Sequence, residues 1–589
     1  MKDTITYDHC LYDTDSDDHE THEFLRRSSW DGHAENLTHL HNKYISPTKP
    51  YLLKAQRFLL RLRLLRRTAW RRTPRPLIIL AKCLLLFITS ILILTPIFLP
   101  SYNNPPIHYS RLAHSCRGTN PKDGCANLWN DQVFIATILY DKSGKLASGP
   151  FADRLLKLIH ILGPENVFLS IYENDSGPKG KEALERLKAR VPCRNSIVSE
   201  DHVSLDGFPT VTLPDGTPRV KRVAYLAELR NRALRPLDRK NQQNGVDGVR
   251  KFDKVLFLND IVFDPVDAAN LLFSTNVDPA TNKANYVAAC AMDFWFGHRM
   301  YDIYAMRDAD GYASYQAIYP FFGDRGRGLS RRDVLESKDA VRVKSCWGGV
   351  MAMQARYVQN VEEEKPKGRA WEEGVVAGHA IDPENNTVAV TGPVRFRHEP
   401  GAYYDACECC LFSADLTQVA KKMGDLPAPE TMKGSESGIY VNPYVRVAYE
   451  EGVYKMIHVV RLWEKLIRVI YDLQTKWLEP VAQNPWRTVQ EGETFEEEIW
   501  NGNGWEVRNH TGRPGLFCGV RDMQVLRVGG KRAGKSGNNW ANTRMPPGQK
   551  MKFRTWWGEI LPASWRQDYK DVPAEKKETF FYKLYSWDT

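Results

Sequence analysis

Residues 253–265 read DKVLFLNDIVFDP, and this stretch decides how the rest of the chain is interpreted. Residues 255–258 form a short, continuous apolar run, which is typical of a strand buried on both faces of a parallel sheet. Asn259 and Asp260 follow the run directly. Open α/β sheets bind their ligands at the carboxyl ends of their strands, so Asp260 is expected at a ligand and metal site. The alternative is that Asp260 caps a helix that begins near Asp264.

A short acidic motif at such a strand end is typical of sugar-nucleotide transferases of the GT-A type. There it holds a divalent metal ion, which neutralises the diphosphate leaving group. The pair Asn259-Asp260 resembles a weakened form of this motif, with one carboxylate instead of two. Because the side-chain ligands are hard oxygens, Mn²⁺ or Mg²⁺ is the expected metal.

The chain before this stretch alternates between short apolar runs and helical patterns. Residues 133–140 and 167–172 are expected strands, and residues 149–162, 182–191 and 222–234 are expected helices. This alternation predicts an α/β fold with a largely parallel sheet. We expect a GT-A-like mixed sheet flanked by helices over residues 131–450. An amphipathic helix at 459–478 and a Trp-rich, β-rich appendage are expected after it.

Several polar residues along this pattern are candidates for binding a nucleotide-sugar donor. Tyr172 and Glu173 end the second strand, where they would contact the nucleoside. Arg222 and Arg230 lie on the third helix, and each carries a planar fork that suits phosphate. Asn231 follows Arg230 and is included with the donor-binding residues. The alternative for both arginines is a solvated helix face or a surface ion pair.

Residues 77–99 predict a membrane span, since Lys82 is their single charged residue. At 1.5 Å per residue they make a helix of about 34 Å, which exceeds a bilayer core of about 30 Å. Nine Lys or Arg residues lie between Lys54 and Arg75, whereas residues 101–110 contain none. The positive side stays in the cytosol, so residues 101–589 are expected in the secretory lumen. We therefore expect a single-pass type II protein in the Golgi or ER membrane.

The net charge of +10 does not indicate nucleic-acid binding. The nine basic residues before the span account for most of it, and ten minus nine leaves +1 for the other residues. We therefore divide the chain into a disordered cytosolic tail (1–76), an anchor (77–99), a stem (100–130), the nucleotide-sugar domain (131–450) and the appendage (451–589).

Cysteines and sequons fit a lumenal domain. Nine of the eleven cysteines follow the span, in a compartment that permits disulfides. Cys116 and Cys125 enclose eight residues and could close a small loop. Sequons begin at Asn174, Asn385 and Asn509 on the lumenal side, so a glycoprotein is expected.

Five segments resemble, in the same order, the fungal capsule-associated α-1,3-mannosyltransferases, which are type II membrane proteins. They are YENDSG (172–177), RVAYLAELRNRAL (222–234), VLFLNDIVFDPVDAANLL (255–272), ECCL (408–411) and NPYVRVAY (442–449). The resemblance covers roughly residues 130–450. It implies a GDP-mannose donor, a mannose-containing glycan acceptor, α-1,3 transfer and a divalent metal.

The resemblance also bears on individual residues. Glu408 matches the family's Glu-Cys-Cys-Leu, although Cys407 stands where the family usually has Ser, so an altered disulfide pattern is possible. The family keeps Arg-Asp at Arg307-Asp308, which favours a substrate-orienting pair. Asp308 and Asp310 also form a literal Asp-x-Asp, but no buried strand leads into it and a glycine follows. We therefore interpret Asp310 as a turn residue.

Asp293, near the end of an expected strand at 287–295, and Glu408 are the candidates for catalysis. Either would stabilise positive charge at the anomeric carbon or orient the acceptor hydroxyl. Transfer from GDP-α-mannose to an α-linkage retains configuration and needs no strong general base. An inverting enzyme would use one of the two as the base. His398 is a candidate metal or diphosphate ligand, with a solvated side chain as the alternative. Trp347 is either a sugar platform or a core residue.

Two other functions remain open from the sequence. Asn259, where a second carboxylate would be stronger, favours a non-catalytic lumenal protein that supports polysaccharide synthesis or export. A transferase with a different sugar-nucleotide donor is the other alternative.

Overall fold

The computed structural model describes residues 75–117, 121–238, 250–314, 318–359, 393–426, 437–469, 482–527 and 539–543, and residues 546, 548, 554 and 555. Helix α3 (Arg75–Phe98) belongs to one unit of the chain, and residues 101–589 belong to another. Within the described residues, Ile79–Phe98 is the one helical stretch long and apolar enough to cross a membrane, with 6% of its apolar window buried. By length and composition, α3 is compatible with a single-pass membrane protein.

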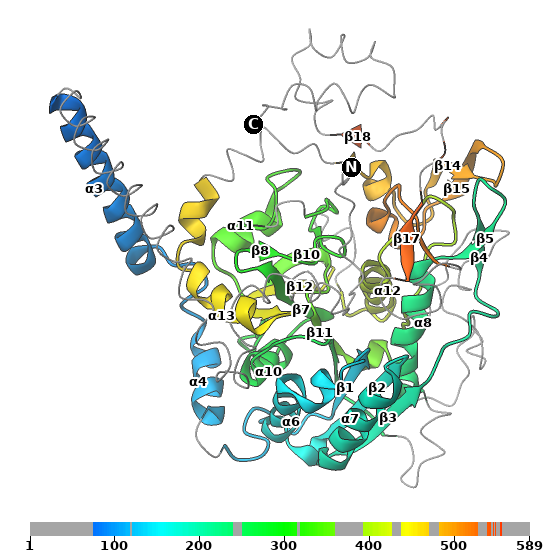
Figure 1. Ribbon diagram of the computed structural model, residues 1–589, viewed down its shortest axis with the longest axis horizontal. Coiled ribbons are helices and arrows are strands. Elements are labelled where there is room, and N and C mark those ends of the chain that lie inside the picture. Colours follow the sequence, from blue (N-terminus) through cyan, green and yellow to red (C-terminus); the bar gives the residue numbers. More distant parts are fainter. Residues whose placement is uncertain are drawn as a thin grey trace, which may run out of the picture. The chain divides into compact units, whose positions relative to one another are not determined.

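A ten-stranded mixed sheet forms the centre of the second unit (Figure 1). Its strand order is β3-β2-β1-β6-β11-β7-β12-β10-β9, with β8 paired to β7. The strands are β1 (Val133–Leu139), β2 (Val167–Asn174), β3 (Arg194–Glu200), β6 (Lys254–Leu258), β7 (Ala288–Phe296), β8 (Arg299–Met300), β9 (Arg307–Asp308), β10 (Val341–Ser345), β11 (Val350–Gln354) and β12 (Ile439–Ala448).

Strand directions bring several chain segments to one edge of this sheet. Strands β3, β2, β1 and β6 are parallel. Strand β11 is antiparallel to both β6 and β7, so β7 runs in the same direction as β6. The carboxyl ends of β1, β6 and β7 and the amino end of β11 therefore share an edge. In an α/β sheet this is the edge where ligands bind.

Helices cover both faces of the sheet (Figure 1). Alternate side chains of β1, β6 and β7 enter one of two apolar cores, as the two-residue period of a strand requires. One core contains Phe257 and side chains of α8 and α12, and the other contains Leu258 and side chains of α6, α7 and α10. These helices are α6 (Pro150–Leu162), α7 (Gly177–Arg190), α8 (Arg222–Leu234), α10 (Pro265–Phe273) and α12 (Glu408–Lys422).

The mixed α/β sheet with flanking helices confirms the predicted fold class. The predicted helix at 222–234 matches α8 at both ends. The predicted strand at 255–258 lies within β6, all of which is buried. The helix after it is capped by Asp264, whose side chain accepts a 2.7 Å hydrogen bond from the backbone N–H of Val266. Asp260 is therefore not the cap, and that alternative is wrong.

The helix predicted at 459–478 differs from the structure. Helix α13 (Glu451–Val460) ends where the prediction begins, and a turn at 461–463 separates it from helical residues 464–469. Residues 470–478 lie outside the described residues. The turn brings Glu464 to the buried guanidinium of Arg446, at 2.6 Å. Apolar periodicity alone does not reveal this buried ion pair, which lies directly after the interruption.

The remaining described elements are short. They are α4 (Ile107–Cys116), α5 (Lys145–Ser148) and α11 (Leu329–Leu335), and the hairpins or pairs β4 (Thr210–Thr212) with β5 (Pro218–Val220), β13 (Ala482–Gln483) with β18 (Arg554–Thr555), β14 (Thr494–Trp500) with β15 (Trp505–Thr511), and β16 (Gln524–Leu526) with β17 (Trp540–Asn542). The described strands after residue 480 agree with a β-rich carboxyl-terminal segment.

Disulfides and sequons are partly as expected. Cys116 and Cys125 form the predicted small loop, and Cys290–Cys346 and Cys410–Cys518 are further disulfides. Asn174 is buried and donates a 2.9 Å hydrogen bond to the Tyr225 hydroxyl, so this sequon is not accessible to a glycan in the folded chain. Asn509 is exposed on β15, and Asn385 lies outside the described residues.

Candidate active site

Asn259 and Asp260 directly follow β6 at the ligand edge of the sheet. Asp260 keeps part of its surface accessible, and among the described residues the one hydrogen-bond donor to its carboxylate is its own backbone N–H. Burial raises the pKa of Asp260 to about 7, with the nearby Asp141 carboxylate acting in the same direction and Arg230 opposing it. A carboxylate that lacks a strong donor and lies near a second carboxylate suits a bound cation.

Asp141 follows β1 at the same edge of the sheet. Its Oδ2 accepts hydrogen bonds from the backbone N–H groups of Leu146 (2.8 Å) and Ala147 (3.0 Å), which hold it at the start of α5. Asn259 is buried, its Oδ1 lies 3.5 Å from the guanidinium of Arg230, and its Nδ2 has no partner among the described residues. The oxygens of Asp260, Asp141 and Asn259 are of the type that Mn²⁺ and Mg²⁺ take, so these residues fit the predicted metal.

Arg230 and Glu408 form a buried ion pair beside Asn259. Arg230 lies on α8 and Glu408 begins α12, and the Nε–Oε1 distance is 3.0 Å. The Arg230 guanidinium also lies 4.3 Å from the ring centroid of Trp347. Burial raises the pKa of Glu408, and Arg230 opposes the shift. Both arginine alternatives, a solvated helix face and a surface ion pair, are wrong for Arg230.

The turn from Trp347 to Gly349 lies against the end of β6 and against Ala291 within β7. Trp347 is fully buried among aromatic side chains, which agrees with a core residue. A Cβ atom on Gly348 would lie 2.0 Å from the backbone oxygen of Ala291, and Gly348 has φ +59°. Gly349 accepts the backbone hydrogen bond of Asn259. Two glycines are therefore needed for the backbone of this turn to approach both β6 and β7.

Asp293, on β7, lies near the Arg230–Glu408 ion pair. Asp302, which the sequence analysis did not select as a site residue, lies beside it. The backbone N–H of Asp302 donates to Asp293 Oδ1 at 3.1 Å, and the Tyr449 hydroxyl lies 3.3 Å from Asp293 Oδ2. Burial raises the pKa of Asp293 to about 7. The charges of Glu408 and Arg230 both act on Asp302. The structure thus brings Asp293, Glu408, Arg230 and Asn259 together, as candidates that were predicted separately.

Tyr172 and Glu173 have local partners at the end of β2. The Tyr172 hydroxyl donates to Glu200 at 2.6 Å and accepts from Arg232 at 2.8 Å. Glu173 accepts from the backbone N–H of Ser176 at 2.9 Å and from the hydroxyl of Ser199. These bonds fix the strand end, and a role of either residue in nucleoside binding stays a prediction.

The side chains of Asn231 and Arg222 contact other parts of the protein, so their predicted binding of the nucleotide-sugar donor has no support in these contacts. The Asn231 side chain exchanges hydrogen bonds of 2.8 and 2.9 Å with the backbone of Phe396. The Arg222 guanidinium lies 3.9 Å from the ring centroid of Trp540 and 3.3 Å from Gln524 Oε1, both in the carboxyl-terminal segment. The geometry gives both residues a structural part.

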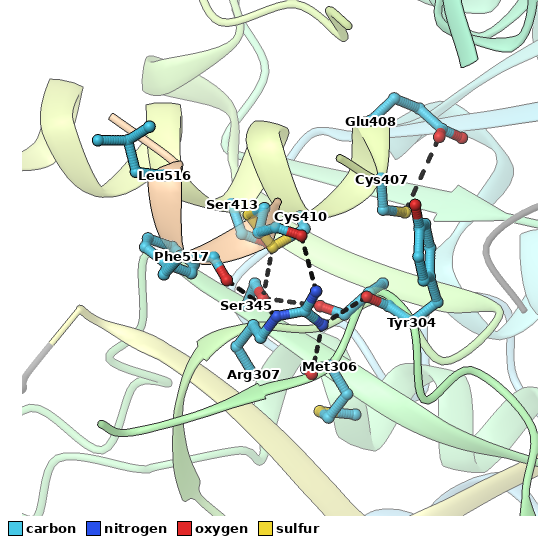
Figure 2. The surroundings of a disulfide bond; sticks show 12 residues. Tyr304, Met306, Arg307, Ser345, Cys407, Glu408, Cys410, Ser413, Leu516 and Phe517 are labelled. Carbon is cyan, nitrogen blue, oxygen red and sulfur yellow. Dashed lines mark hydrogen bonds between the residues drawn. A yellow bond between two sulfur atoms is a disulfide. The ribbon is translucent and has the colours of Figure 1, made fainter. Parts of the chain in front are cut away.

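Asp308 and Arg307 lie on β9, at the far edge of the strand order from β3. Figure 2 shows the Arg307 guanidinium among backbone carbonyls of residues 304, 306, 517 and 518, beside the Cys410–Cys518 disulfide. Asp308 Oδ1 accepts from the backbone N–H groups of Asp310 and Tyr312, and Asp310 pairs with Arg327. Asp310 lies in the turn that follows β9, as expected. The contacts of Asp308 do not support a part in orienting the substrate.

His398 is buried, so the alternative of a solvated side chain is wrong. It lies two residues after Phe396, whose ring is 5.5 Å from the Arg230 guanidinium. Its assignment as a metal or diphosphate ligand stays a prediction. Cys407, Glu408 and Cys409 also place ligand atoms within 4.8 Å of one another. Because Arg230 already supplies a positive charge to Glu408, this second cluster is a poor cation site.

Residues 132–415 match the family model described as Cryptococcal mannosyltransferase 1. The match supports the cryptococcal-type mannosyltransferase family for this part of the chain. The family indicates that the chain is a sugar transferase. The matched range includes residues 141, 259, 260, 293, 302 and 408. A search of curated proteins found no match.

Two solved structures are similar to the chain at low identity. One is the mannosyltransferase PcManGT from Pyrobaculum calidifontis in complex with GDP-Man and Mn²⁺, with 11% identity, 65% of this chain and 74% of that chain covered, and a TM-score of 0.25. The other is glucosyl-3-phosphoglycerate synthase from Mycobacterium tuberculosis in complex with Mg²⁺ and UDP, with 12% identity, 70% and 93% covered, and a TM-score of 0.25. The assignment to a family rests on the family model and not on these two.

Asp302 and Asp141 are the site residues that sequence reasoning missed. Asp302 lies in YDIYAMRDADG (301–311), which shows neither a strand nor a helix pattern. The contact of Tyr301 with Tyr449, at 5.0 Å between ring centroids, brings the segment to the strand ends. Asp141 follows a predicted strand, and the rule that selected Asp260 could have selected it as well.

Proposed function

We propose that this chain is a metal-dependent mannosyltransferase that moves mannose from GDP-mannose to a mannose-containing glycan, forming an α-1,3 linkage with retention. The observation that carries the proposal is the position of Asp260. It is a partly accessible carboxylate at the ligand edge of the sheet, in a segment of the mannosyltransferase family. A type II anchor through α3 in the Golgi or ER membrane is part of the same proposal.

Asp260, with Asn259, would hold Mn²⁺ or Mg²⁺, which supplies positive charge to the diphosphate of the donor. The Arg230–Glu408 pair fixes the amide of Asn259 and the start of α12 beside it. Asp293 and Glu408 are the carboxylates that would stabilise positive charge at the anomeric carbon or orient the acceptor hydroxyl. In a retaining transfer the departing phosphate takes the acceptor proton, so none of these residues must act as a strong base.

The test measures GDP release by the full-length, detergent-solubilised protein with GDP-mannose and Mn²⁺. We expect slow donor hydrolysis, and Asp260→Asn should reduce it by about 100-fold or more, since the ligand to the charge-neutralising metal is lost. Asp215→Asn is the control, because Asp215 lies exposed in the β4–β5 hairpin.

Three results would contradict the proposal. Hydrolysis that Asp260→Asn leaves unchanged would remove the metal site from residue 260. Thermal stabilisation by UDP but not by GDP would indicate another donor. No hydrolysis, no transfer and no stabilisation by any nucleotide would favour the non-catalytic lumenal function.

A further inference from the structure

Asp302 has a buried carboxylate oxygen that nothing in the described fold uses. The residue is fully buried, and its Oδ1 accepts a 3.0 Å hydrogen bond from the backbone N–H of Ala305. Its Oδ2 is buried and has no hydrogen-bond partner among the described residues. A buried polar atom without a partner loses its hydrogen bond to water and gains none in the protein, so such an atom in a native protein calls for an explanation.

Asp293 shares the neighbourhood but has no such open atom. Its Oδ1 accepts from the backbone N–H of Asp302 at 3.1 Å, and its Oδ2 lies 3.3 Å from the Tyr449 hydroxyl. Asp293 therefore holds the 302 loop against β7, while Asp302 presents an unused oxygen. Burial raises the pKa of Asp302 well above its usual range, and Asp293 and Glu408 add to the shift. A protonated carboxyl can both donate and accept a hydrogen bond.

Two further unpartnered polar atoms belong to residues around the same Arg230–Glu408 pair. They are Asn259 Nδ2 and Trp347 Nε1, and both are buried. Asn259 lies 3.5 Å from the Arg230 guanidinium, and Trp347 lies under it. Asn259 Nδ2 and Trp347 Nε1 are hydrogen-bond donors, and Asp302 Oδ2 is a carboxyl oxygen. Three such atoms without partners match a ligand whose groups both donate and accept hydrogen bonds. Hydroxyl groups of a sugar have that character.

We propose that Asp302 binds a hydroxyl group of a hexose at this site and thereby contributes to the choice of sugar, with Asp293 as its positioning residue. The inference rests on the proposed transferase function. The hexose is either the mannosyl group of the donor or the mannoside acceptor, because both present the same hydroxyl chemistry.

The first experiment uses thermal unfolding of the full-length protein, Asp302→Asn and Asp302→Ala, each with GDP and with GDP-mannose in the presence of Mn²⁺. GDP should stabilise all three proteins equally. If the donor hexose is bound, the additional shift that GDP-mannose produces over GDP should be lost in both variants. Asp302→Asn keeps an oxygen that can accept the hydrogen bond from the backbone N–H of Ala305. It therefore provides the test if Asp302→Ala does not fold. Asp278→Ala, in an exposed loop, is the control.

The second experiment measures transfer with deoxymannose donors and acceptors. Loss of a hydrogen bond to a carboxylate should lower kcat/KM by about 10- to 100-fold in Asp302→Ala with normal sugars. For the one deoxy sugar that lacks the contacted hydroxyl, wild type and variant should have the same kcat/KM. If this deoxy sugar is a donor, Asp302 contacts the donor hexose. If it is an acceptor, Asp302 contacts the acceptor hexose. A purely structural role would lower kcat/KM for every sugar alike.

The outcomes separate the two proposals. A wild-type protein that neither GDP nor GDP-mannose stabilises, and that transfers nothing, overturns the transferase function and this inference with it. The other outcome is an active wild-type enzyme whose Asp302 variants keep the thermal shifts with GDP and GDP-mannose and the same kcat/KM pattern with deoxy sugars. This outcome overturns only the part assigned to Asp302.

Discussion

Arg230 and Glu408 show what a single residue contributes at this site. Both are essentially inaccessible, with exposed fractions of 1% and 0%, and each depends on the other for compensation of its charge. Such a pair is costly to bury, and it destabilises strongly when one partner is removed. The pair therefore explains why Asn259 and the start of α12 have fixed positions beside Asp260.

We predict that Arg230→Met lowers the free energy of unfolding by about 3–5 kcal/mol, because it leaves Glu408 buried without a counter-charge. The double variant Arg230→Met with Glu408→Leu should recover most of this loss. Urea unfolding followed by intrinsic tryptophan fluorescence gives the measurement. The control is Arg235→Met, which removes a partly exposed ion pair with Glu228 and should cost less than about 1 kcal/mol. Equal losses in the two single variants would show that the Arg230–Glu408 pair is not the stabilising contact.

At the scale of elements, the β10–β11 connection decides whether the strand ends can assemble. Gly348 approaches the backbone of β7 so closely that no side chain fits, and its neighbour Gly349 also has a positive φ. A backbone atom cannot move aside as a flexible side chain would. The site therefore depends on two residues that have no side chain at all.

We predict that Gly348→Ala prevents correct folding or lowers the thermal midpoint far more than Gly216→Ala does. Gly216 also has a positive φ, +78°, but a Cβ atom there meets nothing within 4 Å. It therefore shows the cost of the backbone conformation alone, about 1–2 kcal/mol. Thermal unfolding of both variants makes the comparison. Similar midpoints would mean that the β7 backbone adapts and that the close approach is unimportant.

A second element-scale prediction concerns β14 and the residues that pair with it. Burial would raise the pKa of Glu497, but the hydrogen bond from His510 and the ion pair with Arg513 outweigh it and lower the pKa to about 2. The folded value is below the ordinary 4.5, so this group stabilises the fold fully above pH 4.5 and loses that effect as the pH falls toward 2.

The measurement is the difference in unfolding free energy between wild type and Glu497→Gln as a function of pH. We expect the wild type to be more stable at neutral pH, and the difference to shrink between about pH 4.5 and 2 as the wild-type carboxylate is protonated. A constant difference over this range would show that Glu497 stabilises by packing and not by charge.

At the scale of the whole molecule, the described carboxyl-terminal residues are part of the body that carries the site. Arg513 reaches the buried Glu399 at 2.9 Å, and Cys518 is bonded to Cys410 on α12. Arg222, at the start of α8, packs on Trp540. Both helices that supply the Arg230–Glu408 pair are therefore held from the carboxyl-terminal side.

We predict that a chain truncated after residue 480 does not reach a folded, protease-resistant state, because Glu399 and the packing surface of α8 lose their partners. Expression of residues 1–480 beside the full chain, with protease resistance as the measurement, tests this. A truncated protein that is protease-resistant and still stabilised by GDP would contradict it.

The sequence by itself determined the β6 strand, helix α8, the α/β fold class and the apolar helix α3, because each depends on local periodicity or composition. It also gave Asp260 a place at a strand end, since strand direction follows from alternating strands and helices. Tertiary structure alone decided that Arg230 meets Glu408, that Asn231 is used by Phe396, and that Asp302 joins Asp293. These contacts join residues that lie 9 to 178 positions apart, and they depend on which strands and helices become neighbours. No local pattern encodes that choice, because the energy of a buried polar contact exists only once the partner is in place.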